Sequence, residues 1–529
     1  MLTLQNIAYS YPGSELLFDD ISFTLDTHQK IALVGNNGSG KSTLLRIAAA
    51  ELFPSAGVIT CDEERYYVPQ HFGQFDELTI AGALRIEAKL LALRDILNGA
   101  MTDHNLTVLA DDWGIEERCA AALATWGLQG LDLATGMSQL SGGEKTKVFL
   151  AGIAIHEPGI VMLDEPSNHL DAAGRALLYD YISSAKQDLL VVSHDRSLLN
   201  LLDETCELSP GGIACYGGNY DFYIAQKANE DNAFLQDLKS KEKELRKARI
   251  VEREAMERKQ KLDARGKKKQ EKSGLPTISM NTLRNNAEKS TSRMKGVHAE
   301  KIGSLSDDVT RLRKELPEAD KMKIGFDNSA LHKGKILVKA NGISFRYGEQ
   351  ELWQDPLSLE VRSGMRLAIK GRNGSGKTTL IRMLLGSLLP QSGTLDRAEF
   401  KSVYIDQDYS IIDSSRSVYE QVQDFNSAKL PEHELKRRLT HFLFTQHYWE
   451  KGSGTLSGGE KMRLALCCLS LTAAPPDMII LDEPTNNLDI QNAAILTDAI
   501  NQYRGTLVVV SHDALFLAEV GVTEEIDLG

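Results

Sequence analysis

The loop sequence Gly35-Asn36-Asn37-Gly38-Ser39-Gly40-Lys41-Ser42 occurs a second time, in the other half of the chain, as Gly371-Arg372-Asn373-Gly374-Ser375-Gly376-Lys377-Thr378. Both copies fit the pattern G-x-x-x-x-G-K-[ST], whose backbone N–H groups and lysine bind nucleotide phosphates. Each copy follows a short apolar run, at 30–34 or 366–370, and precedes a helix with apolar periodicity. Strand, loop and helix form the context that the pattern requires, so the sequence predicts two nucleotide-binding domains.

Further motifs follow each loop in the same order. They are Pro-x-x-Gly, a glutamine, Leu-Ser-Gly-Gly-Glu-Lys, an apolar run ending in Asp-Glu, another aspartate and Val-Val-Ser-His-Asp. In the first half they lie at 54–57, Gln70, 140–145, 160–165, Asp171 and His194, and in the second half at 390–393, Gln407, 456–461, 479–483, Asp489 and His512. Continuous apolar runs of this length are typical of parallel strands buried on both faces of a sheet.

This set of motifs resembles the ATP-binding cassette family in both halves of the chain. The predicted fold is α/β, with two P-loop ATP-binding cassette domains at 1–222 and 335–529, joined by a helical-hairpin linker at 223–334. The resemblance implies an ATPase that converts ATP and water to ADP and phosphate, with ATP and Mg²⁺ as cofactors. It also implies that the two cassettes pair within one monomer.

The resemblance assigns roles to individual residues. It implies that Glu165 and Glu483 activate the attacking water and that His194 and His512 lie near the γ-phosphate. The implied metal ligands are Ser42, Gln70, Asp164, Thr378, Gln407 and Asp482. The implied nucleotide-binding residues are Tyr11, the whole first loop with Thr43, Ser141, Gly142 and Gly143, and in the second half Tyr347, the whole second loop with Thr379, Ser457, Gly458 and Gly459.

The Leu-Ser-Gly-Gly-Glu motif adds a prediction about how the halves cooperate. A serine hydroxyl and glycine N–H groups at the start of a helix form an anion site. In the family, this site completes the ATP pocket of the opposite cassette. Ser141 is therefore expected to face the nucleotide on Lys377, and Ser457 the nucleotide on Lys41. ATP binding would close the pair and hydrolysis would open it.

The length and composition of the chain limit the number of domains and the class of protein that it can be. A chain of 529 residues exceeds what one hydrophobic core supports. No run approaches the roughly 18 apolar residues of a membrane span, and the first residues do not read as a signal peptide. The six cysteines lack C-x-x-C spacing, which indicates free thiols in a reducing compartment. These observations predict a cytoplasmic protein without a membrane domain.

The segment between the cassettes differs in charge from the rest of the chain. Residues 241–300 contain 18 Lys or Arg against 9 Asp or Glu, whereas the whole chain carries a net charge of -13. We expect two antiparallel helices, 232–262 and one ending before Pro317, packed as a coiled coil through Leu235, Leu238, Leu245, Ile302, Leu305, Val309, Leu312 and Leu316. The predicted tip, about 263–286, concentrates cations that attract RNA phosphates: Arg265, Lys267, Lys268, Lys269, Lys272 and Arg284.

Tandem cassettes joined by a charged hairpin resemble the ABC-F family. The stretches Glu165-Pro166-Ser167-Asn168-His169-Leu170-Asp171 and Glu483-Pro484-Thr485-Asn486-Asn487-Leu488-Asp489 are similar to the family's usual E-P-T-N-H-L-D. This resemblance implies a protein that binds the ribosome near the tRNA exit site, contacts rRNA and P-site tRNA, and modulates translation or protects against ribosome-targeting antibiotics. It also implies that an insertion at about 74–127 is an arm that touches the ribosome.

Two other functions remain compatible with the motifs alone, because cassettes serve many processes. One is a DNA-associated repair or structural ATPase that uses the hairpin as a clamp. The other is the ATPase subunit of a transporter. The sequence lacks the basic C-terminal extension of some relatives, so no DNA partner is expected. Housekeeping translation factor and antibiotic-resistance protein are not separable from these residues.

Overall fold

The computed structural model describes residues 1–13, 16–209, 211–270, 296, 299–313, 332, 334–348, 350–372, 374–472, 474–486 and 488–529, without the side chains of 263, 266–270 and 350. The chain divides into two compact units. The first unit, Met1–Tyr223 with Lys321–Gly529, contains both cassettes, and the second is Ile224–Asp320. In the described part of the chain, no helix combines the length and the apolar character that crossing a membrane requires.

The first cassette is built on a six-stranded sheet in the order β5-β6-β7-β3-β8-β9. The strands are β3 Lys30–Val34, β5 Arg65–Val68, β6 Ile160–Asp164, β7 Asp188–Val192, β8 Glu204–Ser209 and β9 Gly212–Tyr216. All neighbouring pairs are parallel except β8 with β9. Every residue of β6 and β7 is buried, as expected for strands covered on both faces.

Helices and a second sheet cover the two faces of this sheet. A three-stranded antiparallel sheet, β2-β1-β4, packs with α1 on one face. Its strands are β1 Leu2–Ser10, β2 Leu16–Leu25 and β4 Ala56–Cys61, and α1 is Lys41–Ala48. The other face packs against α6 Gly142–His156, α7 Ala172–Ser184 and α8 Arg196–Leu199. The loop that connects β3 to α1 therefore lies at one end of the central sheet.

The second cassette repeats this plan. Its five-stranded parallel sheet has the order β16-β17-β18-β14-β19, and its antiparallel sheet the order β13-β10-β15. The strands are β10 Ile336–Ser344, β13 Leu357–Arg362, β14 Arg366–Lys370, β15 Ser392–Arg397, β16 Ser402–Ile405, β17 Met478–Asp482, β18 Thr506–Val510 and β19 Glu524–Asp527, with a small pair β11 Arg346–Tyr347 and β12 Gln350–Glu351. The main helices are α11 Lys377–Leu385, α14 Gly458–Leu469, α15 Ile490–Gln502 and α16 Ala514–Glu519.

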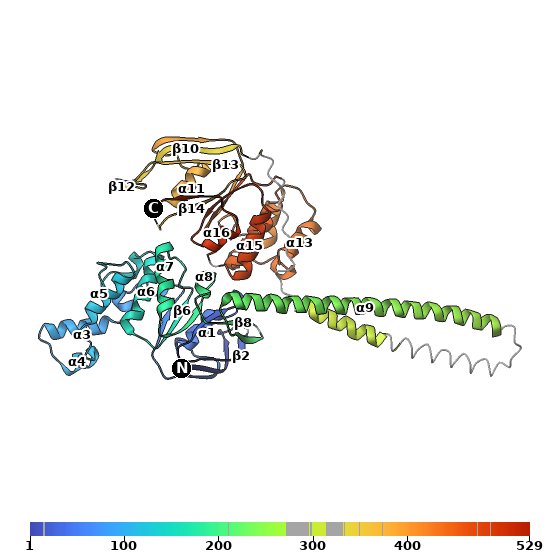
Figure 1. Ribbon diagram of the computed structural model, residues 1–529, viewed down its shortest axis with the longest axis horizontal. Helices are drawn as coiled ribbons and strands as arrows, with labels where there is room; N and C mark the ends of the chain where they lie inside the picture. Colours follow the sequence, from blue (N-terminus) through green and yellow to red (C-terminus); the bar gives the residue numbers. More distant parts are fainter. Residues whose placement is uncertain are drawn as a thin grey trace. The chain divides into compact units, whose positions relative to one another are not determined.

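The insertion at about 74–127 is helical. It contains α2 Ile80–Ala83, α3 Glu87–Leu97, α4 Asp103–Leu109 and α5 Ile115–Thr125. The corresponding stretch of the second cassette has α12 Val418–Asp424 and α13 Glu432–His441. Helices α3 and α4 pack against each other at the edge of the first cassette (Figure 1). The extra length of the first half therefore forms a helical pair.

The second unit begins within the first turn of α9, Tyr220–Gln270, a helix of 51 residues. A returning helix includes 299–313. Leu238, Val309 and Leu312 form a buried cluster, and Phe234 and Leu245 pack against it at half exposure. The prediction that Leu238 and Leu245 pack against Val309 and Leu312 is therefore confirmed. Arg313 adds an ion pair with Glu242 at 2.6 Å.

Helix α9 continues beyond the predicted end near residue 262. It passes through Gly266 and ends at Gln270. A single glycine in a helix costs only about 1 kcal/mol relative to alanine, and the surrounding Lys, Arg and Ala residues favour helix. Arg265 lies exposed on the last turns, while the side chains of Lys267, Lys268 and Lys269 and all of Lys272 and Arg284 lie outside the described residues.

The structure corrects the expectation that every cysteine is a free thiol. Cys206 and Cys215 form a disulfide, whereas Cys61, Cys119, Cys467 and Cys468 are free. The pair lies directly opposite in the antiparallel register of β8 and β9. Sequence spacing did not reveal this pairing, because it depends on how the hairpin turns between the two strands. The cysteines thus no longer indicate a reducing compartment.

This correction makes a simple chemical prediction. Under denaturing conditions without a reductant, iodoacetamide should label four of the six cysteines, and all six after reduction. Peptide mass spectrometry should place the two protected thiols at Cys206 and Cys215. Labelling of all six cysteines without a reductant would contradict the disulfide, and the variant C206S/C215S serves as a reference for the four free thiols.

Candidate functional site

Each phosphate loop connects a central strand to the helix that follows. The first runs from β3 to α1 and the second from β14 to α11. The last glycine of each loop, Gly40 or Gly376, has φ of 95° or 92° and caps the helix. A side chain at Gly40 would approach the Phe18 ring to 2.8 Å. Glycine is therefore required here, and the loop can wrap its N–H groups around an anion.

The loop lysines lie in the mouths of these loops. The Lys41 ammonium group donates to the carbonyl oxygens of Gly35 at 2.7 Å and Asn36 at 3.1 Å. Lys377 donates to Gly371 at 2.7 Å and lies 3.1 Å from Nε2 of His512. Burial lowers the pKa of both lysines, and nearby carboxylates oppose this shift. Each ammonium group is thus held where a phosphate can replace its carbonyl contacts.

An aspartate ends the strand next to each loop. Asp164 ends β6, is almost fully buried, and accepts hydrogen bonds from Ser42 Oγ at 3.1 Å and from the Tyr67 hydroxyl at 3.0 Å. Asp482 ends β17 and accepts from the Tyr404 hydroxyl at 2.8 Å. Burial raises the pKa of both carboxyl groups. Ser42 Oγ and Asp164 together form the hard oxygen donor set that suits Mg²⁺.

A glutamate and a histidine adjoin each aspartate. His194 Nε2 lies 3.3 Å from Glu165 Oε1, and His512 Nε2 lies 3.4 Å from Glu483 Oε1. Burial raises the pKa of Glu165 to about 8 and that of Glu483 to about 7. Burial also lowers the pKa of His194 to about 3 and that of His512 to about 4, so both imidazoles are neutral.

Each of these glutamates has one carboxylate oxygen without a hydrogen-bond partner among the described residues. Both have positive φ, 51° for Glu165 and 47° for Glu483, which turns the chain sharply at the end of the strand. Their Oε1 atoms are buried and, despite the nearby imidazole nitrogens, have no partner of hydrogen-bond geometry among the described residues. A buried acceptor without a partner is costly and points to a missing ligand. A water molecule between the glutamate and a phosphate would satisfy it.

An exposed tyrosine stands beside each loop. The Tyr11 and Tyr347 side chains are 43% and 57% exposed. Their hydroxyl groups lie 2.9 Å from Thr43 Oγ1 and 3.3 Å from Thr379 Oγ1, so both rings are tied to the first turn after the lysine. Gln70 and Gln407 follow β5 and β16 by two residues, half-buried and exposed respectively.

The Leu-Ser-Gly-Gly-Glu motifs begin α6 and α14. Ser141 and Ser457 each cap their helix in a capping box with Glu144 or Glu460. A side chain at Gly459 would collide with Asn492 at 2.3 Å, which explains a glycine there. Both serines are exposed. That each serine faces the nucleotide of the opposite cassette stays a prediction.

Two contacts join the cassettes within the first unit. The N–H of Asn37, in the first phosphate loop, donates to Asp489 Oδ2 at 3.3 Å. Arg196, in α8, forms an ion pair with Glu519, in α16, at 2.7 Å. The phosphate loop of one cassette thus contacts the aspartate that begins α15 of the other.

Sequence reasoning missed Tyr67 and Tyr404. The motif search singled out the glutamines but not the tyrosines three residues before each of them. The equal spacing in both repeats, Tyr67 to Gln70 and Tyr404 to Gln407, was the available signal. Asn373 and Asn487 lie outside the described residues.

Comparisons with known proteins agree with this geometry. A family model described as ABC transporter matches residues 18–168 and 354–486. ATP-binding protein Uup of Caulobacter vibrioides is 30% identical over 96% of this chain and 74% of its own length. Putative ATP-binding protein YdiF of Bacillus subtilis is 29% identical over 98% and 79%. ABC transporter F family member 5 of Arabidopsis thaliana is 27% identical over 98% and 73%.

Solved structures share the fold of the whole chain. The structure described as RNase-L Inhibitor superposes with a TM-score of 0.59 at 20% identity, covering 98% of this chain and 86% of that one. The archaeal ribosome recycling factor aABCE1, in complex with the stalk protein aP1, gives 0.58 at 20% identity, covering 97% and 86%. These likenesses confirm the arrangement of two cassettes along one chain.

The loop lysines provide a direct test of the two sites. K41A or K377A removes the ammonium group that is predicted to bind phosphate, so each variant should bind one fluorescent ATP analogue per chain instead of two. The double variant should bind none, as measured by equilibrium titration. The exposed Lys339 of β10 provides a matched control, and K339A should bind two. Two bound nucleotides in K41A/K377A would exclude these loops as the nucleotide sites.

Proposed function

Because the chain belongs to the ABC family of ATP-binding proteins and has the tandem cassettes of its F group, we propose that it is an ATP-driven factor that binds the ribosome near the tRNA exit site. ATP hydrolysis is the activity of such cassettes, and the chain is an ATPase. On the ribosome, it modulates translation or protects against ribosome-targeting antibiotics. We place it in the cytoplasm, where that partner is found.

The unpartnered glutamate oxygens carry the proposed mechanism. Glu165 and Glu483 each direct a buried Oε1 to the position of the attacking water and accept its proton. His194 and His512, neutral at physiological pH, donate a hydrogen bond toward the γ-phosphate as charge develops there.

The remaining residues bind and orient the nucleotide. Lys41 and Lys377 bind the β- and γ-phosphates, and the tyrosines beside them, Tyr11 and Tyr347, stack on adenine. Ser42 and Asp164, whose oxygens lie 3.1 Å apart, would hold Mg²⁺ with Gln70, as would Thr378, Asp482 and Gln407 in the second cassette. The ion would neutralise charge on the β- and γ-phosphates. Ser141 and Ser457 complete the opposite sites when the cassettes close.

The hairpin is our candidate for the part that contacts RNA. Helix α9 carries exposed arginine and lysine side chains up to Arg265, near its end. Several of them along the helix are already paired with glutamates one turn away, for example Arg253 with Glu257 at 3.1 Å. From 263 to 271 the sequence has four cations, Arg265, Lys267, Lys268 and Lys269, against two acidic residues, Asp263 and Glu271. This excess of positive charge favours a phosphate backbone as partner.

The choice of the ribosome has further support. One solved structure of similar fold is described as a ribosome recycling factor, and another as ribosome-bound. The alternatives are a DNA-associated ATPase and the ATPase subunit of a transporter. The family model is described as ABC transporter, so the transporter subunit remains an alternative. Binding to DNA or to membranes in the tests below would support one or the other alternative.

Trapping the ATP-bound form tests the proposed partner. E165Q/E483Q removes both proton acceptors while keeping the side chains' size, so ATP should bind without being hydrolysed. We expect this variant to sediment with ribosomes in the presence of ATP, and the wild-type protein to do so far less. E157Q/E399Q changes two exposed glutamates instead and should behave as wild type. A trapped protein that stays in the supernatant, or that binds DNA or membranes instead, would contradict ribosome binding.

The tip lysines test how the partner is held. In the trapped background, K267A/K268A/K269A should weaken ribosome binding and lower the slope of log affinity against log salt by up to about 3, since each lost phosphate contact lowers it by about 1. The matched control K239A/K241A/K243A removes the same charge near the start of α9. An equal effect of both triple variants would show that overall charge, and not the tip, matters.

A further inference from the structure

In each cassette, a tyrosine hydroxyl donates to the aspartate at the end of the neighbouring strand. Tyr67 reaches Asp164 Oδ2 at 3.0 Å, and Tyr404 reaches Asp482 Oδ2 at 2.8 Å. The two cassettes are separate folding cores with different sequences around these residues. The same contact therefore occurs twice in one molecule, which is difficult to attribute to chance packing.

Strand register explains how the contact arises. Tyr67 of β5 pairs with Met162 of the parallel strand β6, and Asp164 lies two residues further along β6, on the same face. Tyr404 pairs with Ile480 in the same way, two residues before Asp482. A tyrosine that leans along its strand reaches the carboxylate at the strand end. A phenylalanine in either position would pack similarly but leave the carboxylate oxygen without its donor.

The contact fixes the orientation of the carboxylate in the first cassette. Asp164 Oδ1 accepts from Ser42, and Oδ2 accepts from Tyr67, so both oxygens are held and the group cannot rotate freely. A hydrogen bond to an ionised acceptor is roughly twice as strong as one between neutral groups. Such outer partners orient metal ligands and influence metal affinity strongly.

We propose that Tyr67 and Tyr404 are positioning residues that hold the carboxylates of Asp164 and Asp482 in the orientation that binds the divalent cation accompanying ATP. This inference rests on the proposed metal-binding role of the two aspartates. The tyrosines themselves do not touch nucleotide or metal. Their effect is to keep each carboxylate ready before the nucleotide arrives.

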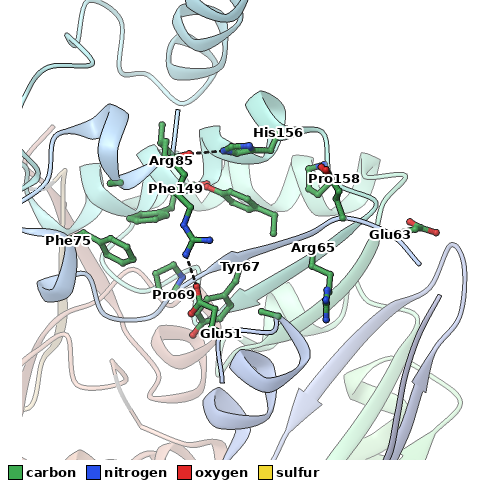
Figure 2. Close-up of a pocket in the computed structure, with 15 residues that line it drawn as sticks. Glu51, Glu63, Arg65, Tyr67, Pro69, Phe75, Arg85, Phe149, His156 and Pro158 are labelled. Atoms are coloured by element: carbon green, nitrogen blue, oxygen red, sulfur yellow. Dashed lines mark hydrogen bonds and ion pairs between the residues drawn. The ribbon is translucent and has the colours of Figure 1, made fainter. Parts of the chain in front are cut away.

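The surroundings of Tyr67 distinguish this role from simple packing. Tyr67 lies on the wall of a cavity of about 420 Å³, with Pro69 and Glu51 close to it (Figure 2). Its neighbour Tyr66 lines the same cavity, but Tyr66 donates to the backbone carbonyl of Phe149 at 3.0 Å and stacks on His156. A ring beside a cavity contributes less packing than one in the core. The contact with Asp164 thus accounts for the hydroxyl of Tyr67.

Tyr66 also provides a matched control for the experiment. Y66F removes a buried phenol oxygen in the same strand, and Y503F removes the hydroxyl that donates to the Pro476 carbonyl at 2.8 Å in the second cassette. Y67F/Y404F and Y66F/Y503F therefore delete the same number of hydrogen-bonding hydroxyl groups, one from each cassette, although Tyr503 is more deeply buried than Tyr404. Only the first pair acts on the aspartates. Thermal melting should verify that both double variants are folded to the same extent.

The measurement separates metal binding from nucleotide binding. A fluorescent ATP analogue is titrated in EDTA and then at increasing Mg²⁺ or Mn²⁺, and Mn²⁺ binding is followed by electron paramagnetic resonance. We expect Y67F/Y404F to bind the analogue in EDTA as the wild type does, but to need about 10-fold more divalent cation for half-maximal effect. Each single variant should shift only one of the two sites. Y66F/Y503F should match the wild type.

Two results would overturn the inference. One is a cation requirement of Y67F/Y404F within twofold of Y66F/Y503F. The other is an equal loss of analogue binding in EDTA, which would assign the tyrosines to the nucleotide pocket. The proposed function fails in a different way. If divalent cations had no effect on analogue binding by the wild-type protein, the aspartates would not be metal ligands, whatever the tyrosine variants did.

Discussion

Two acidic side chains buried side by side at the end of a strand are the constraint on which the rest of the first cassette depends. Asp164 and Glu165 are 1% and 6% exposed, and the loop lysine, Lys41, is 7% exposed. Removing an ion from water costs several kcal/mol even after the protein relaxes. The raised pKa of Glu165 reports that cost. The cluster is therefore costly without a ligand and is suited to a phosphate and a cation that complete its charges.

The surrounding fold supplies what this cluster needs. The central strands β6 and β3 are adjacent to β7 in one buried sheet, which places the acidic pair next to the lysine without exposing either. Hydroxyl groups of Ser42 and Tyr67 satisfy the aspartate, and the backbone N–H of His194 donates to Glu165 Oε2 at 3.2 Å. One glutamate oxygen remains without a hydrogen-bond donor. Among the described residues, Nδ1 of His194 is the other buried polar atom of this cluster without a partner of hydrogen-bond geometry, so the glutamate and the histidine together present the unsatisfied groups.

The two cassettes share their motifs but differ at a charged position outside them. Four residues after Asp171 stands Arg175, whereas four residues after Asp489 stands Ala493. Burial raises the pKa of both glutamates; the positive charge of Arg175 opposes this effect at Glu483, whereas at Glu165 the opposing charge is that of Lys41. The two candidate catalytic glutamates thus have different charged neighbours. Motif inspection judged the two sites alike because Arg175 lies outside every motif.

The sequence predicted what local geometry determines and missed what strand register determines. Phosphate loops, helix caps and buried strands follow from short patterns, and the structure has each of them. The Cys206–Cys215 disulfide and the Tyr67–Asp164 contact join residues on neighbouring strands, so their proximity depends on pairing that no short pattern encodes. The end of α9 was misplaced because one glycine, Gly266, was given more weight than its helix-favouring neighbours.

The interactions that stabilise the long helix α9 differ from those that stabilise the cassettes. A helix of 51 residues would extend about 77 Å at 1.5 Å per residue. Its first turn packs into the core of the first cassette through Tyr220 and Tyr223, and further along, among the described residues, a small cluster forms around Leu238. Its exposed ion pairs, such as Arg258 with Glu254, contribute at most about 1 kcal/mol each. Beyond this first turn, helix propensity and a short apolar seam maintain the helix. We therefore expect substitutions near the end of α9 to have little effect on the stability of the two cassettes, which are built around separate apolar cores.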